Sequence, residues 1–300
     1  MMSTMNHYIA IDHTGCTSRI MLCDDTQILH QGKGDVMDPA CDVWRYIQDL
    51  VQCSLKAASV GREEVTRLVI GSNEMEGSQL KELLAGFLPH TEIMIASRQE
   101  LFLAGSLRGA AGIVVVADDS SIAFGRNAQG TILHTGGYGW RLGDEGSSYW
   151  LAKEAIRRTL AATELRDIPS SLEAVICSFF QMEEIREAIP LVNNPATKKT
   201  TIAKFAPFVT KAALNGDELA LDIEKQGSEA LAELVFSITK KLRPPFTKTV
   251  ICNGNSFNND LVLYQFFTKR MKERLPSYHV SLATPQCALE GAMFLAKEEK

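Results

Sequence analysis

The sequence lacks the features that mark several large classes of protein. No run approaches the roughly 20 apolar residues that a membrane-spanning helix needs, and the polar first seven residues contain no apolar core of a signal peptide. Lys and Arg number 31 against 36 Asp and Glu, a formal net charge of -5, so no basic excess favours a nucleic acid or an anionic membrane. We therefore expect a cytoplasmic protein with neither kind of partner.

Cysteine and histidine are also sparse in the patterns that bind metals. The seven cysteines are an odd number, and none forms a C-x-x-C pair. Several, such as Cys23, lie in apolar runs, which favours buried reduced thiols over disulfides. The six histidines show no spacing typical of a ligand set, so we expect no structural zinc site.

What the chain does have is an alternation of strands, polar turns and helices. Its 300 residues suggest about two domains. Strands are predicted at residues 7–12, 19–23, 27–30, 67–70, 92–96, 112–117, 122–126, 131–134, 249–252 and 278–282. Helices are predicted at 42–58, 79–88, 100–107, 145–162, 171–180, 182–189, 202–214, 217–241, 259–273 and 287–297. This order is typical of α/β folds, in which ligands bind at the carboxyl ends of strands.

The opening three-strand pattern returns after about a hundred residues. QILHQG at 27–32 matches TILHTG at 131–136, and the order of strands around these segments also matches. Because solenoid repeats are about 20–50 residues long, this spacing indicates a duplicated domain. The alternative is two meanders that share turn chemistry. We predict one domain at 1–107 plus 287–300, and a second, with a helical insertion, at 108–286.

Two strand–loop–strand turns that face each other would suit a phosphate clamp. Asp12 ends the first strand, where a carboxylate can hold the cation that accompanies a triphosphate. Gly15, in the following turn, would let backbone N–H groups approach phosphate oxygens. D-x-x-G after a strand is also a common turn, so this signal alone is weak.

The most specific motif is GGYGWRLGDEGSSYW at residues 136–150. Four glycines lead to an acidic pair, and a helix follows. A buried carboxylate beside glycines can bind vicinal sugar hydroxyls, and we expect Asp144 to find a Ser, backbone N–H or water partner when no sugar is bound. A Gly-rich loop before a capped helix is the alternative.

This motif resembles the signature of the N-acetylglucosamine kinase family. That family is similar to the BadF/BadG/BcrA/BcrD-type ATPases, which activate reductases and dehydratases, and belongs to the sugar kinase/actin/heat-shock-protein superfamily. ALEGAMFLA at 288–296 resembles the family's closing helix, and the resemblance covers essentially the whole chain. It implies two ribonuclease-H-like (actin-like ATPase) domains with an interlobe cleft, ATP and Mg²⁺, and phosphorylation of an N-acetylhexosamine hydroxyl.

The resemblance also implies site residues. For phosphate and nucleotide they are Asp12, Gly15, Ser120, Ser121, Gly254 and Asn255, with Asp12 also the Mg²⁺ ligand. For the sugar they are Ser72, Asn73, Gly136, Gly137 and Asp144. The expected partners are an amino sugar and, as an option, a second copy of the chain.

The chain departs from the family where phosphate is handled. The second phosphate loop, normally G-T-G-S, is DDSS at 118–121, so two carboxylates would face a triphosphate. Arg98 or Gln99 stands where the family has its catalytic Asp, which leaves Glu100 as the candidate catalytic residue. The adenosine loop has Gly254-Asn255 in place of Gly-Gly.

These departures predict an N-acetylglucosamine kinase-like protein with weak or absent turnover. One alternative is an active kinase that uses Glu100 or another acid, and a second is a non-catalytic sugar-binding or regulatory homologue. A third is a dehydratase or reductase activase ATPase. The dispersed cysteines argue against the activase, which needs a cysteine pair at its dimer interface for an iron–sulfur cluster.

Overall fold

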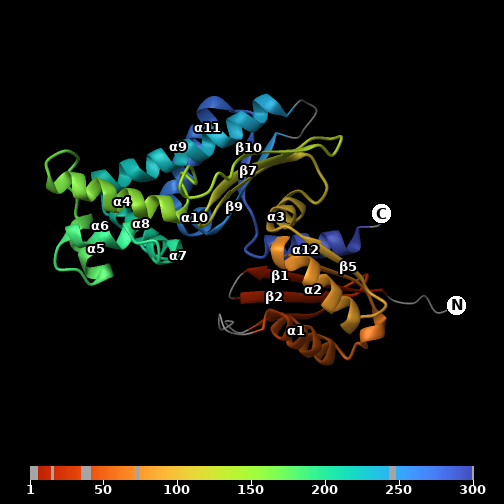
Figure 1. Cartoon of the computed structure of the whole chain (residues 1–300). Coiled ribbons are helices and arrows are strands. Elements are labelled where there is room, and N and C mark those ends of the chain that lie inside the picture. Colours follow the sequence, from red (N-terminus) through yellow and green to blue (C-terminus); the bar gives the residue numbers. More distant parts are fainter. Residues whose placement is uncertain (1–5, 15–16, 35–41, 72–73, 243–247, 299–300) are drawn as a thin grey trace. The chain divides into compact units, whose positions relative to one another are not determined.

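The computed structural model describes residues 6–14, 17–34, 42–71, 74–242 and 248–298. The chain divides into two compact units, which are described separately (Figure 1). Unit 1 comprises the residues up to Gly109 together with those from Thr284 onward, and unit 2 is Ala110–Ala283. Within the described ranges, no helix combines the length and the apolar character that crossing a membrane requires.

Unit 1 is built on a five-stranded mixed sheet in the order β3-β2-β1-β4-β5. β1 pairs antiparallel with β2 and parallel with β4. Helices α1 and α2 pack on the sheet, and α3 packs beside α12, the last helix of the chain (Figure 1). The elements are β1 (His7–Thr14), β2 (Thr17–Cys23), β3 (Ile28–Lys33), α1 (Val43–Ala58), η1 (Arg62–Glu64), β4 (Val65–Gly71), α2 (Glu74–Phe87), β5 (Glu92–Ala96), α3 (Arg98–Leu107) and α12 (Cys287–Lys297).

The C-terminal helix joins unit 1 through glycine contacts. A Cβ atom on Gly105 of α3 would lie 1.9 Å from the Cys287 carbonyl oxygen, and one on Gly291 of α12 would lie 1.9 Å from the Leu101 carbonyl oxygen. The two helices approach so closely because neither has a side chain at these positions. This contact brings residues from the end of the chain into the first folded unit.

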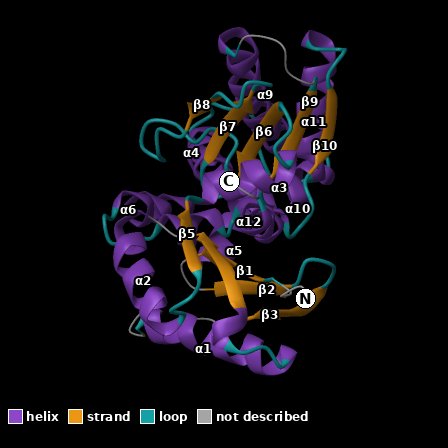
Figure 2. Ribbon diagram, turned by 90° about the vertical axis from the view of Figure 1, so that its right-hand side faces the viewer, coloured by secondary structure: helices purple, strands orange, loops and turns teal. Residues whose placement is uncertain are grey.

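Unit 2 contains a second five-stranded mixed sheet, in the order β10-β9-β6-β7-β8 (Figure 2). The long helix α9 packs on β6, β7 and β8, and α11 packs against α9. Helices α4 to α8 extend the unit away from its sheet (Figure 1). The elements are β6 (Gly112–Ala117), β7 (Ser121–Arg126), β8 (Ile132–Gly136), α4 (Ser148–Thr163), α5 (Leu172–Phe180), η2 (Ile185–Glu187), α6 (Ala188–Asn193), α7 (Lys199–Ala203), α8 (Ala206–Leu214), α9 (Glu218–Lys241), β9 (Thr249–Asn253), α10 (Asn255–Asn259), α11 (Leu261–Arg274) and β10 (His279–Leu282).

The two sheets have the same strand order. In each, the first strand (β1 or β6) is central, with two antiparallel strands on one side and two parallel strands on the other. Two meanders that merely shared turn chemistry would have no reason to match in their parallel strands as well. The predicted α/β class with two similar domains is confirmed.

Several predicted helices have different bounds in the structure. The helix predicted at 79–88 begins at Glu74, and three others are divided differently. The segment 202–214 is two helices, α7 and α8, because Pro207 has no N–H and fits the first turn of a helix but not its interior. Predicted 182–189 is the 3₁₀ turn η2 followed by α6. Predicted 259–273 is preceded by α10, and α11 begins after Asp260, whose carboxylate accepts a hydrogen bond from the Leu263 N–H.

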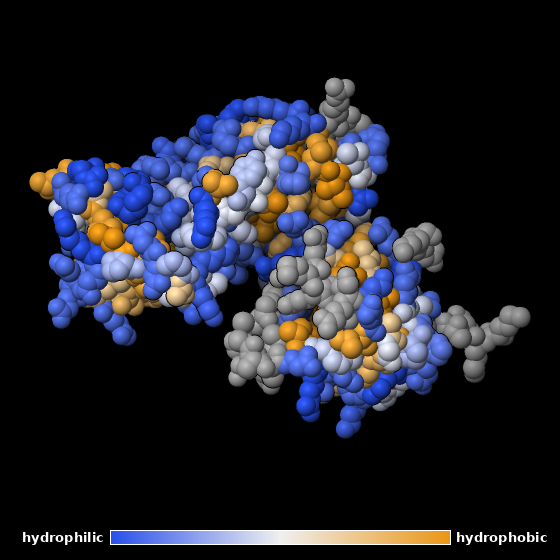
Figure 3. All heavy atoms as spheres, viewed as in Figure 1, coloured by the Kyte–Doolittle hydropathy of each residue, from blue (hydrophilic) through white to orange (hydrophobic). Residues whose placement is uncertain are grey.

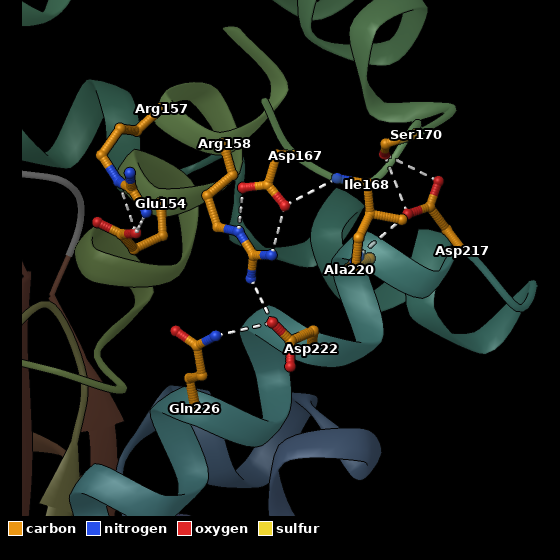
Figure 4. Close-up of polar contacts among 10 residues, drawn as sticks. All are labelled: Glu154, Arg157, Arg158, Asp167, Ile168, Ser170, Asp217, Ala220, Asp222 and Gln226. Carbon is orange, nitrogen blue, oxygen red and sulfur yellow. Dashed lines mark hydrogen bonds and ion pairs between the residues drawn. The ribbon is translucent and has the colours of Figure 1, made fainter. Parts of the chain in front are cut away.

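An ion network around the buried Arg158 lies at the start of the helical extension (Figure 4). The guanidinium of Arg158, on α4, donates two hydrogen bonds to the carboxylate of Asp167 and a third, 2.6 Å long, to Asp222 on α9. Arg158 is 7% exposed. Asp217 accepts hydrogen bonds from both Ser170 and Ala220. The network therefore links α4, the segment after it and α9.

The helical extension also carries hydrophobic surface. Figure 3 shows such surface at the left-hand end of the view, over the part of unit 2 that Figure 1 labels α5 to α8. A pocket of about 490 Å³ between α5 and α8 is lined by Phe179, Phe208 and Lys211 among others. Its mainly apolar lining offers few of the hydroxyl-binding groups that a sugar needs.

The five described cysteines are free thiols. Cys23, Cys252 and Cys287 are buried, as expected from their apolar surroundings, whereas Cys53 is exposed because it lies on the solvent side of α1. Cys16 and Cys41 lie outside the described residues.

Candidate functional site

The loop between β6 and β7 is a tight turn that contacts two other segments of unit 2. The Asp118 N–H donates to the Ser120 carbonyl over 2.9 Å, which closes the turn. The Asp118 carbonyl accepts the Ser148 N–H at 2.8 Å and, more weakly, the Ser256 hydroxyl at 3.4 Å. The predicted phosphate loop is thus joined to the start of α4 and to the turn after β9.

The turn after β9 requires glycine. Gly254 has φ 103°, and a Cβ there would lie 2.4 Å from the Ala117 carbonyl oxygen, so only glycine fits against the end of β6. The next N–H, that of Asn255, donates to Oδ1 of Asp118 over 2.6 Å. The predicted nucleotide residues Gly254 and Asn255 therefore lie directly against the predicted phosphate loop, and the Asp118 carboxylate occupies the Asn255 amide.

Asp144 lies beside the same loop. It has φ 63°, in the left-handed region, and is 2% exposed. Its Oδ1 accepts the Ser121 N–H over 3.2 Å, while its buried Oδ2 has no hydrogen-bond partner among the described residues. Burial raises the pKa of this carboxyl group, and the Ser121 N–H and the Lys199 charge partly oppose that rise.

The two glycines predicted for the sugar site also meet Ser121. The Gly137 N–H donates to the Ser121 carbonyl over 3.0 Å. Gly136 and Gly137 have φ 79° and 73°, so both need the freedom of glycine. Gly136, Gly137 and Asp144, which span nine residues of the sequence, thus converge on the predicted phosphate residue Ser121.

Lys199 is a site residue that the sequence did not indicate. Its Nζ, at the first residue of α7, donates to the Asp119 carbonyl over 3.0 Å, although the two residues are 80 apart in sequence. The positive charge of Lys199 also lowers the pKa of Asp144, so it acts on both acidic residues of this part of the site. No local pattern marks it, since only the packing of α7 brings it there.

A pocket of about 400 Å³ opens beside these residues. Asp119, Asn255 and Ser256 line one part, and Lys204 and Asp260 line another. A volume of several hundred cubic ångströms is typical of small-molecule sites.

A buried acid lies beneath this pocket. Thr210, which also lines the pocket, places its hydroxyl 2.8 Å from Oδ2 of Asp260 and 3.1 Å from Oε1 of Glu224. Glu224 is fully buried, and this burial together with the nearby Asp260 raises its pKa well above the usual value. Behind the part of the pocket that Thr210 and Asp260 line there is therefore a buried acid whose raised pKa favours its protonated form.

Unit 1 has its own strand-end edge. Asp12, Gly71 and Ala96 are aligned across the parallel strands β1, β4 and β5. Asp12 is half-buried and pairs in register with Arg19 on β2. The predicted residues Gly15, Ser72 and Asn73 follow these strands in sequence but lie outside the described residues. β1 continues to Thr14, two residues beyond the predicted end at Asp12, but its parallel pairing with β4 ends at Asp12.

Glu100 takes part in a helix cap. Its Oε2 accepts the Ser97 N–H at 2.7 Å and the Ser97 hydroxyl at 2.8 Å, and the Ser97 hydroxyl in turn accepts the Glu100 N–H. This is a capping box, which satisfies backbone N–H groups at the start of α3. A carboxylate used in this way is poorly placed to take a proton from a substrate, and the assignment of Glu100 as the base stays a prediction.

Comparison with known protein families assigns the chain to one of them. The family model described as BadF/BadG/BcrA/BcrD ATPase matches residues 11–296. The chain belongs to the BadF/BadG/BcrA/BcrD ATPase family. The match spans both units and includes every site residue discussed above. Membership therefore concerns the strand ends of unit 1 as well as those of unit 2.

Two curated relatives from this comparison are sugar kinases by name. The N-acetylmuramic acid/N-acetylglucosamine kinase of Clostridium acetobutylicum is 26% identical over 263 residues, 86% of each chain. The N-acetyl-D-glucosamine kinase of Dictyostelium discoideum is 26% identical over 192 residues, 63% of this chain and 60% of the relative.

Solved structures share the fold of this family member. One from Chromobacterium violaceum, provisionally named an N-acetylglucosamine kinase, has a TM-score of 0.75 at 19% identity, covering 98% of this chain and all of that one. A ROK family glucokinase from Streptomyces griseus, in complex with glucose and AMPPNP, has a TM-score of 0.57 at 15% identity, covering 98% and 100%. At these identities the likeness establishes the actin-like ATPase fold alone.

Proposed function

We propose that this chain binds an N-acetylhexosamine and ATP and transfers phosphate between them only slowly. The contact that carries the proposal is the hydrogen bond between the Asp118 carboxylate and the Asn255 N–H. Family membership and the two kinase relatives support the substrate class.

The sugar side rests on Asp144. Oδ2 of Asp144 is buried without a partner among the described residues, and a buried carboxylate oxygen is costly unless something donates to it. A sugar hydroxyl is a suitable donor, and the neighbouring Gly136 and Gly137 present no side chain to obstruct it. We therefore place the hexosamine at Asp144.

The nucleotide side rests on the 400 Å³ pocket. Its lining by Asn255 and Ser256, on the glycine turn after β9, suits a nucleoside beside a phosphate loop. Lys199 supplies a positive charge at the same loop. Asp12, at the edge of unit 1, is the residue that would hold Mg²⁺, which neutralises phosphate charge when bound.

We expect slow transfer because Asp118, in the loop between β6 and β7, already holds the Asn255 N–H. A phosphate oxygen would have to compete with Asp118 for the Asn255 amide. Two like charges about 4 Å apart repel by about 1 kcal/mol in water and by several times more near a protein surface. Asp118 and Asp119 therefore weaken the affinity for nucleotide, and Lys199 offsets part of the repulsion.

The acceptor side lacks an evident base. Arg98 and Gln99 follow β5 where the family pattern has an Asp, and Glu100 closes the capping box. A positioned general base typically contributes about 10²–10⁴-fold to the rate. A non-catalytic, sugar-binding homologue is the second candidate. If the missing base abolished catalysis completely, sugar binding at Asp144 would be unaffected.

Calorimetry and an assay of ADP release test the proposal together. N-acetylglucosamine should bind the unmodified protein, while ATP with Mg²⁺ should bind weakly. Asp118→Gly combined with Asp119→Thr should raise the affinity for ATP, whereas Asp49→Asn, which removes an exposed charge of unit 1, should not. No binding of N-acetylglucosamine would contradict the proposal, and tight binding of ATP to the unmodified protein would refute the argument from charge.

A further inference from the structure

Between the sugar-site glycines and Asp144 lies an exposed aromatic loop, residues 138–142. Tyr138 is 71% exposed, Trp140 40% and Leu142 82%. The loop is nevertheless ordered by its backbone, because the N–H groups of Leu142 and Gly143 both donate to the Gly139 carbonyl, over 3.1 and 2.9 Å. Its exposed side chains are therefore presented on a fixed turn next to the proposed sugar position.

The side chain of Arg141 is held on this loop by aromatic contacts. Its guanidinium carbon lies 4.9 Å from the centre of the Trp140 ring. Trp140 in turn packs edge-on against Tyr149, with ring centres 5.5 Å apart, and Tyr149 is buried in the first turn of α4. This chain of contacts orients the Arg141 fork in advance of any ligand.

The guanidinium of Arg141 is available to bind an anion. It makes no ion pair with any residue that the structure describes, in contrast to Arg157, Arg158 and Arg166 of the same unit. A planar guanidinium with free N–H donors binds a carboxylate through two parallel hydrogen bonds. Asp144, where we place the sugar, follows three residues later.

The spacing places such an anion within reach of a sugar bound at Asp144. Three residues separate Arg141 from Asp144, so their Cα atoms are at most about 11 Å apart. A hexosamine that carries a carboxyethyl ether spans a distance of this order. Its ring hydroxyls could meet Oδ2 of Asp144 while its carboxylate meets Arg141.

We infer that Arg141 makes this site selective for carboxylate-bearing N-acetylhexosamines over neutral ones. The inference rests on the proposed function, because it places the sugar at Asp144. Trp140 contributes by orienting Arg141 and by offering its exposed face to the apolar part of the ether group.

Calorimetry with three sugars tests this selectivity. The probes are N-acetylglucosamine, N-acetylmuramic acid, and the methyl ester of N-acetylmuramic acid, which has the same shape without the charge. In the unmodified protein we expect N-acetylmuramic acid to bind about tenfold more tightly than the other two, as a charge-assisted pair allows.

Variants assign the effect to Arg141. Arg141→Gln should abolish the tenfold difference without changing the affinity for N-acetylglucosamine, and Arg141→Lys should retain part of it, because a lysine keeps the charge but not the fork. Arg166→Gln, which removes another exposed arginine of unit 2, should change nothing. Thermal melts of the variants control for folding.

The outcomes separate this inference from the proposed function. If N-acetylglucosamine binds but N-acetylmuramic acid has no advantage, the inference is wrong and the proposed function stands. The same holds if Arg141→Gln weakens all three sugars equally. If none of the three binds, both are wrong.

Discussion

The two units have the same sheet order but differ in how they use the acids at their strand ends. In unit 1, the exposed Glu100 accepts two hydrogen bonds from Ser97 and caps α3. In unit 2, Asp144 is buried and keeps one oxygen without a partner among the described residues. An acid at a suitable place in the chain is thus available for chemistry only if the local backbone does not already use it.

Asp118 extends this comparison within unit 2. Its carboxylate accepts the backbone N–H of Asn255 in the turn after β9, just as the Glu100 carboxylate accepts the backbone N–H of Ser97 at the start of α3. Asp118 and Glu100 bind the chain's own backbone, whereas Asp144 uses one oxygen for the Ser121 N–H and keeps the other for the sugar that we propose.

Unit 2 should depend strongly on the ion network around the buried Arg158. Arg158→Met removes the partner of Asp167 and Asp222 and should lower the free energy of unfolding by about 3 kcal/mol. Arg157→Met, at the preceding residue, removes an ion pair with Glu154 in which the arginine is exposed and should cost less than about 1 kcal/mol. Chemical denaturation of both variants measures the difference, and equal losses would show that burial does not set the strength of this network.

Asp144→Asn should weaken the binding of N-acetylglucosamine by about 10- to 100-fold, because a hydrogen bond to a charged group contributes about 1.5–3 kcal/mol. Glu145→Gln changes the exposed neighbouring acid and should have little effect. Calorimetry provides both affinities. An unchanged affinity in Asp144→Asn would mean that the free Oδ2 atom does not face the sugar.

Glu100→Gln should affect stability more than activity. Glutamine also forms capping boxes, so we expect a loss of less than about 1 kcal/mol in the free energy of unfolding, similar to the loss in Ser97→Ala. Any residual release of ADP should stay unchanged. A loss of turnover without a loss of stability would restore Glu100 as the catalytic base.

The buried acids of the two units should respond to pH in opposite directions. In unit 1, hydrogen bonds from the Thr26 and Gln27 N–H groups lower the pKa of Asp24 to about 2, so its contribution to stability is present above about pH 4 and is lost as the pH falls toward 2. In unit 2, burial raises the pKa of Glu224, so its contribution is present at low pH and is lost as the pH rises through the folded value.

Thermal melts over a range of pH check these signs. Asp24→Asn should flatten the loss of stability on the acid side, and Glu224→Gln should flatten it on the basic side. A Glu224→Gln variant with an unchanged pH profile would contradict the raised pKa of Glu224 in the folded protein.

Much of the fold could be predicted because its signals are local. The apolar run of β6 indicates a strand, and the similar segments that form most of β3 and β8 indicate the duplication. Helix bounds failed where one residue overrides a periodic pattern, as Pro207 does between α7 and α8. The motif at 136–150 indicated Asp144 because its glycines and its acid lie within one short segment.

The contacts that decide the site's chemistry are long-range and could not be predicted. Asp118 and Asn255 are 137 residues apart, and Lys199 lies 80 residues from Asp119. The sequence placed two acids in the phosphate loop, but only the fold directs one of them onto the amide of the neighbouring turn. Likewise, the capping role of Glu100 depends on where α3 begins, which the periodicity placed two residues too late.

The release of ADP by the unmodified protein tests the central claim most directly, namely that Asp118 and Asp119 keep the phosphate loop from its usual task. With saturating N-acetylglucosamine or N-acetylmuramic acid and ATP–Mg²⁺, we predict turnover far below the range of about 1–100 s⁻¹ that is usual for kinases. Asp118→Gly with Asp119→Thr should raise the affinity for ATP. Turnover of about 1 s⁻¹ or faster in the unmodified protein would contradict the account.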